Sequence, residues 1–229
     1  MKRFSVAVAL SLLAAGTVMA TPSVMVDQIP GTYPPSLVSG EFRLTPNAEL
    51  GEQLGSMAAF QSFCVERNAS ISVNTTYAAF VNDESVYGGG LTAGELPGPQ
   101  GGDMLSPETA YLYTQYRKNA LVGYDMGAGR VGSATALQAA IWYLEGEYVT
   151  DAAHDYAAFN DLTKQFIADA QNCGWSDTGP VAILNLTDGE KNPYQDMLAL
   201  TASVPAPGAV VLSGLGLSLV GWLKRRQAM

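Results

Sequence analysis

The side chains of this chain that are reactive by type are few: two cysteines, Cys64 and Cys173, and one histidine, His154. A pair of cysteines in an oxidising compartment forms a disulfide by default. A single histidine excludes zinc sites built from several histidines, and any Ser-His-Asp site would depend on it. His154 lies in the polar segment 151–156, which is typical of a solvated helix start. The residue types therefore predict no metal site and no cofactor.

Two segments, one with a cysteine and one with a glutamine, are the strongest candidates for chemistry. Residues 63–66 read Phe-Cys-Val-Glu and have the apolar character of a buried strand, and residues 137–142 read Leu-Gln-Ala-Ala-Ile-Trp near the start of a helix. Over residues 40–146 the chain resembles the Cys-Gln thioester domains of bacterial surface proteins. Those domains carry a cysteine on an early strand and a glutamine in a motif close to Thr-Gln-x-x-Ile-Trp. Leu137 stands where these motifs usually have Thr.

The resemblance implies a thiol at Cys64 and an acyl group at Gln138, which would join as an internal thioester with loss of ammonia. Amide carbonyls are poor electrophiles, so the reaction needs an aligned thiol and a site shielded from water. Donor groups at the helix N-terminus would stabilise the oxyanion. Trp142, four residues after Gln138, would lie on the same helix face and cover the bond. Glu66, on the same side of the strand as Cys64, would relay the proton.

Three fates of Cys64 stay open at this point: the thioester, a Cys64–Cys173 disulfide, and an inert buried thiol. An alternative function is a carbohydrate- or matrix-binding module stabilised by that disulfide. The aromatic side chains that could stack on sugar rings are Tyr111, Tyr113, Tyr116 and Trp175. A hydrolase is a third possibility, but Glu145 and Glu147 are only two positions apart and do not make a glycosidase pair.

Residues 127–132, Gly-Ala-Gly-Arg-Val-Gly, match the G-x-G-x-x-G pattern of dinucleotide-binding folds, and Glu147 follows at a suitable distance. A helix is expected upstream where a βαβ unit should begin, and exported proteins do not normally meet NAD. We interpret this segment as a glycine-rich turn that presents the helix of Gln138.

The two ends predict export. Lys2 and Arg3 precede an apolar run, and Val18-Met19-Ala20 is a small-residue cleavage site, so residues 1–20 are interpreted as a signal peptide. The last 26 residues resemble the PEP-CTERM sorting signal of exported bacterial proteins, or serve as a simple C-terminal anchor. In that tail an apolar segment, 208–223, is expected to be a single transmembrane helix that ends in the cytoplasm. The residues of the signal are Val204, Pro205, Pro207, Lys224, Arg225 and Arg226.

Charge excludes one class of partner. The chain has 12 basic and 21 acidic residues, and five of the basic ones lie in the two removable ends. The exported body therefore carries seven positive and 21 negative charges, or −14. Such a body repels phosphates, which excludes binding to nucleic acid.

The elements expected between the ends are strands and helices in separate stretches. Residues 21–35 are expected as an extended leader, and residues 36–203 as one domain. Strands are expected at 36–44, 60–66 and 75–81, a loop at 88–103, and a C-terminal hairpin from 181–186 and 195–200. Helices are expected from Ser106 to about 121, from Ser133 to Gly146, and over 155–172. This order predicts an α+β class: a β-rich, sandwich-like domain with about three inserted helices.

The sequence thus predicts an exported structural or adhesive module of the cell surface or extracellular matrix, anchored at least transiently by its C-terminus. By resemblance, an exosortase-type membrane protease would recognise the tail. The further partners would be an amine-bearing surface molecule or exopolysaccharide. Because a thioester is consumed when it reacts, the protein is not expected to be an enzyme.

Overall fold

The computed structural model describes residues 20–29, 40–67, 69–85, 103–148, 156–189 and 192–202. The signal-peptide region, most of the 88–103 segment, His154 and the C-terminal tail from 203 onward lie outside the described residues. Among the described residues there is no helix of the length and apolarity needed to cross a membrane.

The described elements follow one another in chain order. They are β1 (Ser23–Gln28), β2 (Phe42–Pro46), α1 (Ala48–Leu54), β3 (Phe60–Ser62), β4 (Thr75–Asn82), β5 (Glu84–Ser85), β6 (Asp103–Met104), α2 (Pro107–Arg117), α3 (Arg130–Leu144), the 3₁₀ turn Tyr156–Ala158, α4 (Asp161–Gln171), β7 (Val181–Thr187) and β8 (Met197–Leu200).

One antiparallel sheet of six strands forms the larger layer, in the order β3-β2-β1-β4-β7-β8, and β5 and β6 make a separate small ribbon. The residues after β3 cross to the opposite edge of the sheet. Val65 N donates to Asp196 O at 3.0 Å, and Leu198 N donates to Phe63 O at 3.1 Å. These bonds nearly close the sheet on itself. The fold is therefore a mixed α/β fold around one nearly closed sheet; the expected strands and helices are present, but the strands form this sheet rather than a sandwich-like arrangement.

The first strand was not expected from the sequence. Residues 23–28, interpreted as part of an extended leader, are extended but lie inside the sheet between β2 and β4. Val24 and Val26 are fully buried there. The alternation of these valines with Met25 and Asp27 is a strand pattern, and the surrounding prolines obscured it.

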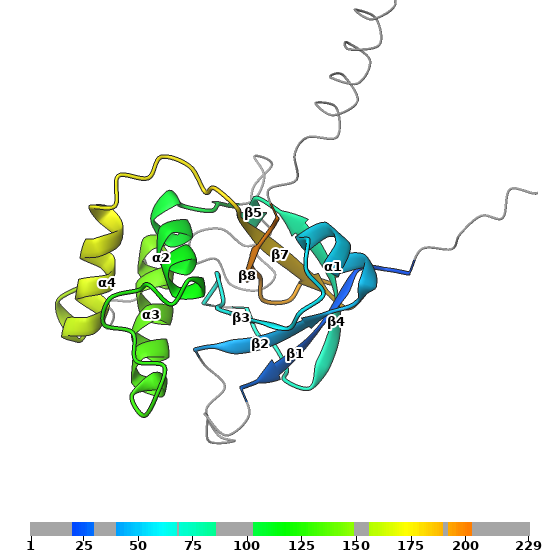
Figure 1. Cartoon of the computed structure of the whole chain (residues 1–229), viewed down its shortest axis with the longest axis horizontal. Coiled ribbons are helices and arrows are strands. Elements are labelled where there is room, and N and C mark those ends of the chain that lie inside the picture. The colour runs from blue at the N-terminus through cyan, green and yellow to red at the C-terminus, as the bar shows by residue number, and fades with distance from the viewer. Residues whose placement is uncertain are drawn as a thin grey trace, which may run out of the picture.

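Of the described helices, α2, α3 and α4 pack together beside the sheet (Figure 1). Ser106 caps α2 with its hydroxyl, which accepts from Thr109 N at 3.1 Å, and Pro107 occupies the first turn, as expected. The short helix α1, capped by Asn47, was not expected. The C-terminal strands pair as expected, since β7 and β8 are antiparallel neighbours.

Helix α3 begins three residues earlier than the sequence indicates. Asp125 organises the glycine turn before it, because its carboxylate accepts from Gly127 N at 2.6 Å and from Gly129 N at 2.9 Å. The Ser133 hydroxyl accepts from Asp125 N at 3.0 Å instead of capping the helix. The helix ends at Leu144 with Glu145 as its C-cap, and Gly146 follows with a left-handed φ of 76°, close to the expected stop.

Candidate functional site

Cys64 lies at the seam where the sheet nearly closes. It forms an isolated bridge with Met197 of β8, and it is 3% exposed. Its neighbours Phe63 and Val65 pack in the cluster of the helical side, whereas Cys64 packs in the cluster of the sheet. Successive side chains of an extended segment point to opposite faces, so the seam places the thiol inside the sheet layer.

Gln138 of α3 meets Cys64 directly. The Cys64 backbone N–H donates to Oε1 of Gln138 at 3.0 Å, and Nε2 of Gln138 donates to the Cys64 carbonyl oxygen at 2.7 Å. Gln138 is 2% exposed. Two hydrogen bonds fix both the position and the plane of the side-chain amide against the residue that carries the thiol.

The source of the activating donor differs from the expectation. Because α3 begins at Arg130, Gln138 is well inside the helix, and the free N–H groups of the helix N-terminus are out of its reach. The donor to the amide oxygen is the Cys64 N–H itself. A donor at that oxygen polarises the carbonyl and is positioned for the oxyanion that a nucleophile would create there.

Trp142 lies one turn after Gln138 on α3. It lines a pocket of about 380 Å³ together with Gln138, Tyr148 and Phe159. It also lines a second pocket of about 280 Å³ together with Cys64 and Arg67. The indole Nε1 is buried and has no hydrogen-bond partner within the described part of the chain. Each member of the Cys64–Gln138 pair thus borders a pocket, and Trp142 borders both.

Glu66, two residues after Cys64, is buried, with 1% of its surface exposed. Its Oε2 accepts from Asp196 N at 3.1 Å, and its carbonyl oxygen accepts from Nε2 of Gln195 at 2.6 Å. Burial, and secondarily the negative charge of Glu66, raise the pKa of the Cys64 thiol well above its ordinary value. The resting group is therefore the thiol, and any attack by its sulfur requires a proton acceptor close by.

The two cysteines are both free thiols, so the disulfide considered from the sequence is absent from the structure. Cys64 is held in the seam, whereas Cys173 follows α4 in the helical layer. The Cys173 sulfur accepts from Trp175 N at 3.3 Å.

The other sequence candidates have structural roles. Tyr113 and Tyr116 are at most 2% exposed and fill the helical core, and Tyr111 packs edge-to-face on Trp175 with centroids 5.7 Å apart. These rings do not form an open stacking surface for sugars.

The remaining motifs also find local partners. Glu145 accepts from the Ser106 hydroxyl at 2.5 Å, while Glu147 accepts from Arg67 N at 3.0 Å, so the two acids face different partners. The N–H groups of Gly127 and Gly129 are taken by Asp125 and are not open to a phosphate. Among the described residues no group of three or more His, Cys, Asp or Glu could hold a metal ion.

Sequence reasoning did not find three buried polar residues of the C-terminal hairpin, of which Gln195 lines a pocket with Cys64. Gln195, Asp196 and Asn185 are buried, and Nδ2 of Asn185 donates to Asp196 Oδ2 at 2.8 Å. They are far from Cys64 and Gln138 in sequence. Their polar type within an otherwise apolar hairpin was the signal that could have found them.

No family model matches this chain, and no curated protein matches it. Two solved structures have a similar arrangement. The first is the N-terminal thioester domain of a surface protein from Clostridium perfringens, with a TM-score of 0.45 and 10% identity over 79% of this chain and 98% of that one. The second is the N-terminal domain of the Streptococcus pyogenes pilus tip adhesin Cpa, with a TM-score of 0.44 and 13% identity over 79% of this chain and 93% of that one.

Proposed function

We propose that Cys64 and Gln138 form an internal thioester and that the protein is an exported surface module that attaches covalently to an amine-bearing partner. The observation that carries the proposal is the pair of hydrogen bonds, 3.0 and 2.7 Å, between the Gln138 amide and the Cys64 backbone. They hold the side-chain amide of a glutamine beside a cysteine, and both residues are buried.

The first step joins the two residues. The Cys64 sulfur attacks Cδ of Gln138, and the oxyanion forms at Oε1, where the Cys64 N–H donates. The thiol proton passes through a base, for which we propose Glu66, whose charge acts on the thiol, to the departing nitrogen. An S–C bond forms, a C–N bond breaks, and ammonia leaves.

In the second step a primary amine of the partner attacks the same carbon. A C–N bond forms, the S–C bond breaks, and the Cys64 thiol regains a proton. The two pockets that meet at Trp142 offer the approach for the amine. Each molecule reacts once and is consumed, so in this proposal the protein attaches itself covalently to the partner and is not an enzyme.

The sequence ends supply the location in this proposal. Residues 1–20 direct export, and the tail from Val204 holds the body at a membrane until an exosortase-type protease acts on it. The body then belongs to the cell surface or the extracellular matrix.

Intact mass spectrometry of the non-reduced protein, with and without methylamine, tests the thioester. A mass short by one ammonia, which becomes a methylamine adduct located at Gln138, is the expected result. Cys64→Ser should show the full mass and no adduct, while the matched control Cys173→Ser should behave as wild type. A full mass with no adduct in the wild type would overturn the proposal.

A further inference from the structure

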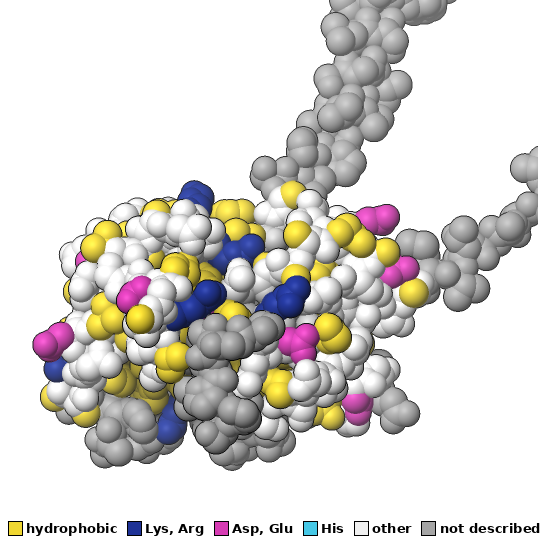
Figure 2. All heavy atoms as spheres, turned by 60° about the horizontal axis from the view of Figure 1, so that its bottom comes forward, with side chains coloured by type: hydrophobic (Ala, Val, Ile, Leu, Met, Phe, Trp, Pro, Cys, Tyr) yellow, Lys and Arg dark blue, Asp and Glu magenta, His cyan; other side chains and the backbone are white. Residues whose placement is uncertain are grey.

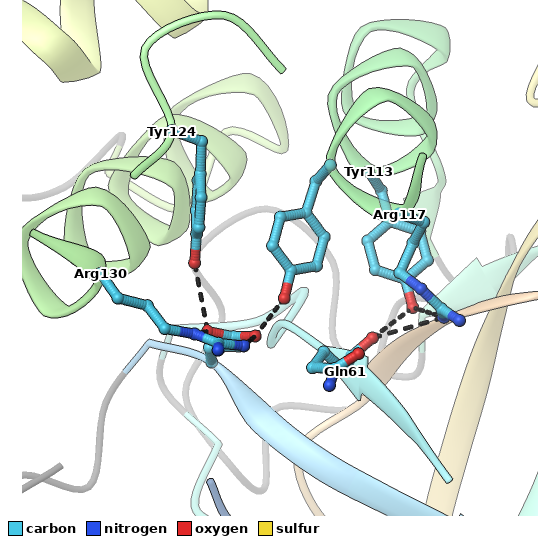
Figure 3. Close-up of polar contacts among 7 residues, drawn as sticks. Gln61, Tyr113, Arg117, Tyr124 and Arg130 are labelled. Carbon is cyan, nitrogen blue, oxygen red and sulfur yellow. Dashed lines mark hydrogen bonds and ion pairs between the residues drawn. The ribbon is translucent and has the colours of Figure 1, made fainter. Parts of the chain in front are cut away.

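A buried carboxylate neutralises one of two arginines at the boundary between the sheet and the helices. Glu41 is 2% exposed, and its oxygens accept from Arg130 Nε at 2.9 Å and from Arg130 Nη2 at 2.5 Å. The hydroxyls of Tyr116 and Tyr124 donate to the same carboxylate. The hydrogen bonds to Glu41 raise the pKa of Arg130, so this guanidinium is permanently charged and fixed in place (Figure 3).

The second arginine, Arg117 of α2, is held without being neutralised. Its Nη1 donates to the Tyr113 hydroxyl at 3.0 Å and to the Gln61 carbonyl oxygen at 3.5 Å, and its guanidinium lies 5.2 Å from the centroid of Phe60. It has no carboxylate partner in the part of the chain that the structure describes. Figure 3 shows it on the far side of the cluster from Arg130.

Both arginines line one pocket of about 360 Å³. The lining residues are Gln61, Tyr116, Arg117, Asn119, Met126 and Arg130. There is no acidic residue among them. On the face drawn in Figure 2 several basic side chains lie near the middle, with acidic side chains beside them and toward the rim. Because Glu41 neutralises Arg130, the pocket offers the positive charge of Arg117 and amide side chains, on a protein whose formal charge is −9.

We propose that this pocket binds a carboxylate-bearing sugar, such as a hexuronate unit of an acidic polysaccharide. The Arg117 guanidinium matches a carboxylate, and the amides of Gln61 and Asn119 can donate to and accept from sugar hydroxyls. The volume falls within the roughly 300–1,000 Å³ of small-molecule sites. The site is separate from the Cys64–Gln138 pair and does not depend on it.

An acidic peptide is the less suitable ligand. An extended peptide would bind by adding to a free sheet edge, and β3 is the edge strand here. The Gln61 carbonyl oxygen on that edge already accepts from Tyr113 and Arg117. The pocket thus presents side chains rather than open backbone groups.

The acidity of the whole protein does not prevent this binding. At 0.15 M ionic strength the screening length is about 8 Å, so charges lining the pocket outweigh more distant ones. Affinity should fall as salt rises, because part of the attraction is between exposed charges.

The test is titration of the purified protein with galacturonate, with galactose and with an oligoglutamate peptide, followed by calorimetry. Saturable binding of galacturonate, with no binding of galactose, is the expected result. Arg117→Gln should weaken it at least about tenfold, the effect of losing one charged hydrogen-bond partner. Lys118→Gln is the matched control, because it removes the same charge from an exposed neighbour that does not line the pocket, and it should change the affinity less than about twofold.

Gln61→Glu is a second variant, since it keeps the backbone bonds and places a negative charge in the pocket; it should abolish binding. Unfolding curves of all variants show whether they are folded. Equal binding of galactose, equal losses in the Arg117 and Lys118 variants, or tighter binding of oligoglutamate would each overturn the proposal. None of these results depends on whether the thioester forms.

Discussion

Glu145 is a buried carboxyl at the end of α3 whose protonation state is coupled to folding. Desolvation raises its pKa from 4.5 to about 7, against the opposing effect of the hydrogen bonds from Ser106. The Ser106 hydroxyl that donates to it also caps α2, so this single carboxyl joins the ends of two helices.

The sign of the pH effect follows from this shift. Between pH 4.5 and 7 the unfolded chain loses the Glu145 proton while the folded chain keeps it, so stability falls as pH rises through this window. The contribution amounts to roughly 3 kcal/mol at most. Glu145→Gln removes the titration and should flatten the dependence of the melting temperature on pH between 5 and 8.

The control for this prediction is Glu52→Gln, which removes an exposed carboxylate on α1. This variant should retain the wild-type pH dependence. A Glu145→Gln profile parallel to that of the wild type would show that the carboxyl does not titrate in this range.

The sequence pointed to some residues of the candidate site and not to others. Cys64, Gln138 and Trp142 were singled out by their types and local motif, and the structure places them close together. The pairing of Glu41 with Arg130 could not be found, because the two are 89 positions apart and only the fold joins them. The donor to the Gln138 oxygen was also misplaced, since it depends on where α3 begins.

Among the elements, those with strong local signals were predicted best. The Ser-Pro start of α2 and the glycine at the end of α3 are local chemistry that needs no tertiary context. The predicted start of α3 was wrong because Asp125 organises a turn before the helix, and the expected serine cap instead bonds to Asp125. Strand β1 was not predicted because the strands that pair with it, β2 and β4, lie elsewhere in the sequence.

The central place of β1 leads to a prediction about truncation. A chain that begins at Thr21, after the proposed cleavage site, retains the strand, whereas a chain that begins at Ser36 lacks it. Without β1, the strands β2 and β4 lose their shared neighbour, and the cluster around Val24 and Val26 is opened. We expect the longer chain to unfold cooperatively in urea and the shorter one to show no cooperative transition.

Circular dichroism and intrinsic fluorescence, recorded in the same titration, measure the outcome. Coincident cooperative transitions for both chains would mean that residues 21–35 are a dispensable leader after all.

At the scale of the whole molecule, the seam of the sheet and the helical layer meet at one point. The chain after β3 closes the sheet against β8, and Gln138 of α3 holds that same crossing through both of its amide hydrogen bonds. A covalent bond there would fasten the two layers to each other in addition to storing a reactive acyl group.

This arrangement predicts that reaction with an amine loosens the fold. A thioester would close a loop between residues 74 positions apart, and a cross-link of that span stabilises by about 4 kcal/mol on chain-entropy grounds. Methylamine opens the cross-link without removing a residue, so the treated wild type should unfold at a lower urea concentration than the untreated protein. Cys64→Ser, which lacks the cross-link, should unfold at the same midpoint with and without methylamine. If treated and untreated wild type unfold together while mass spectrometry shows the adduct, the bond serves attachment alone and contributes nothing to holding the sheet and the helices together.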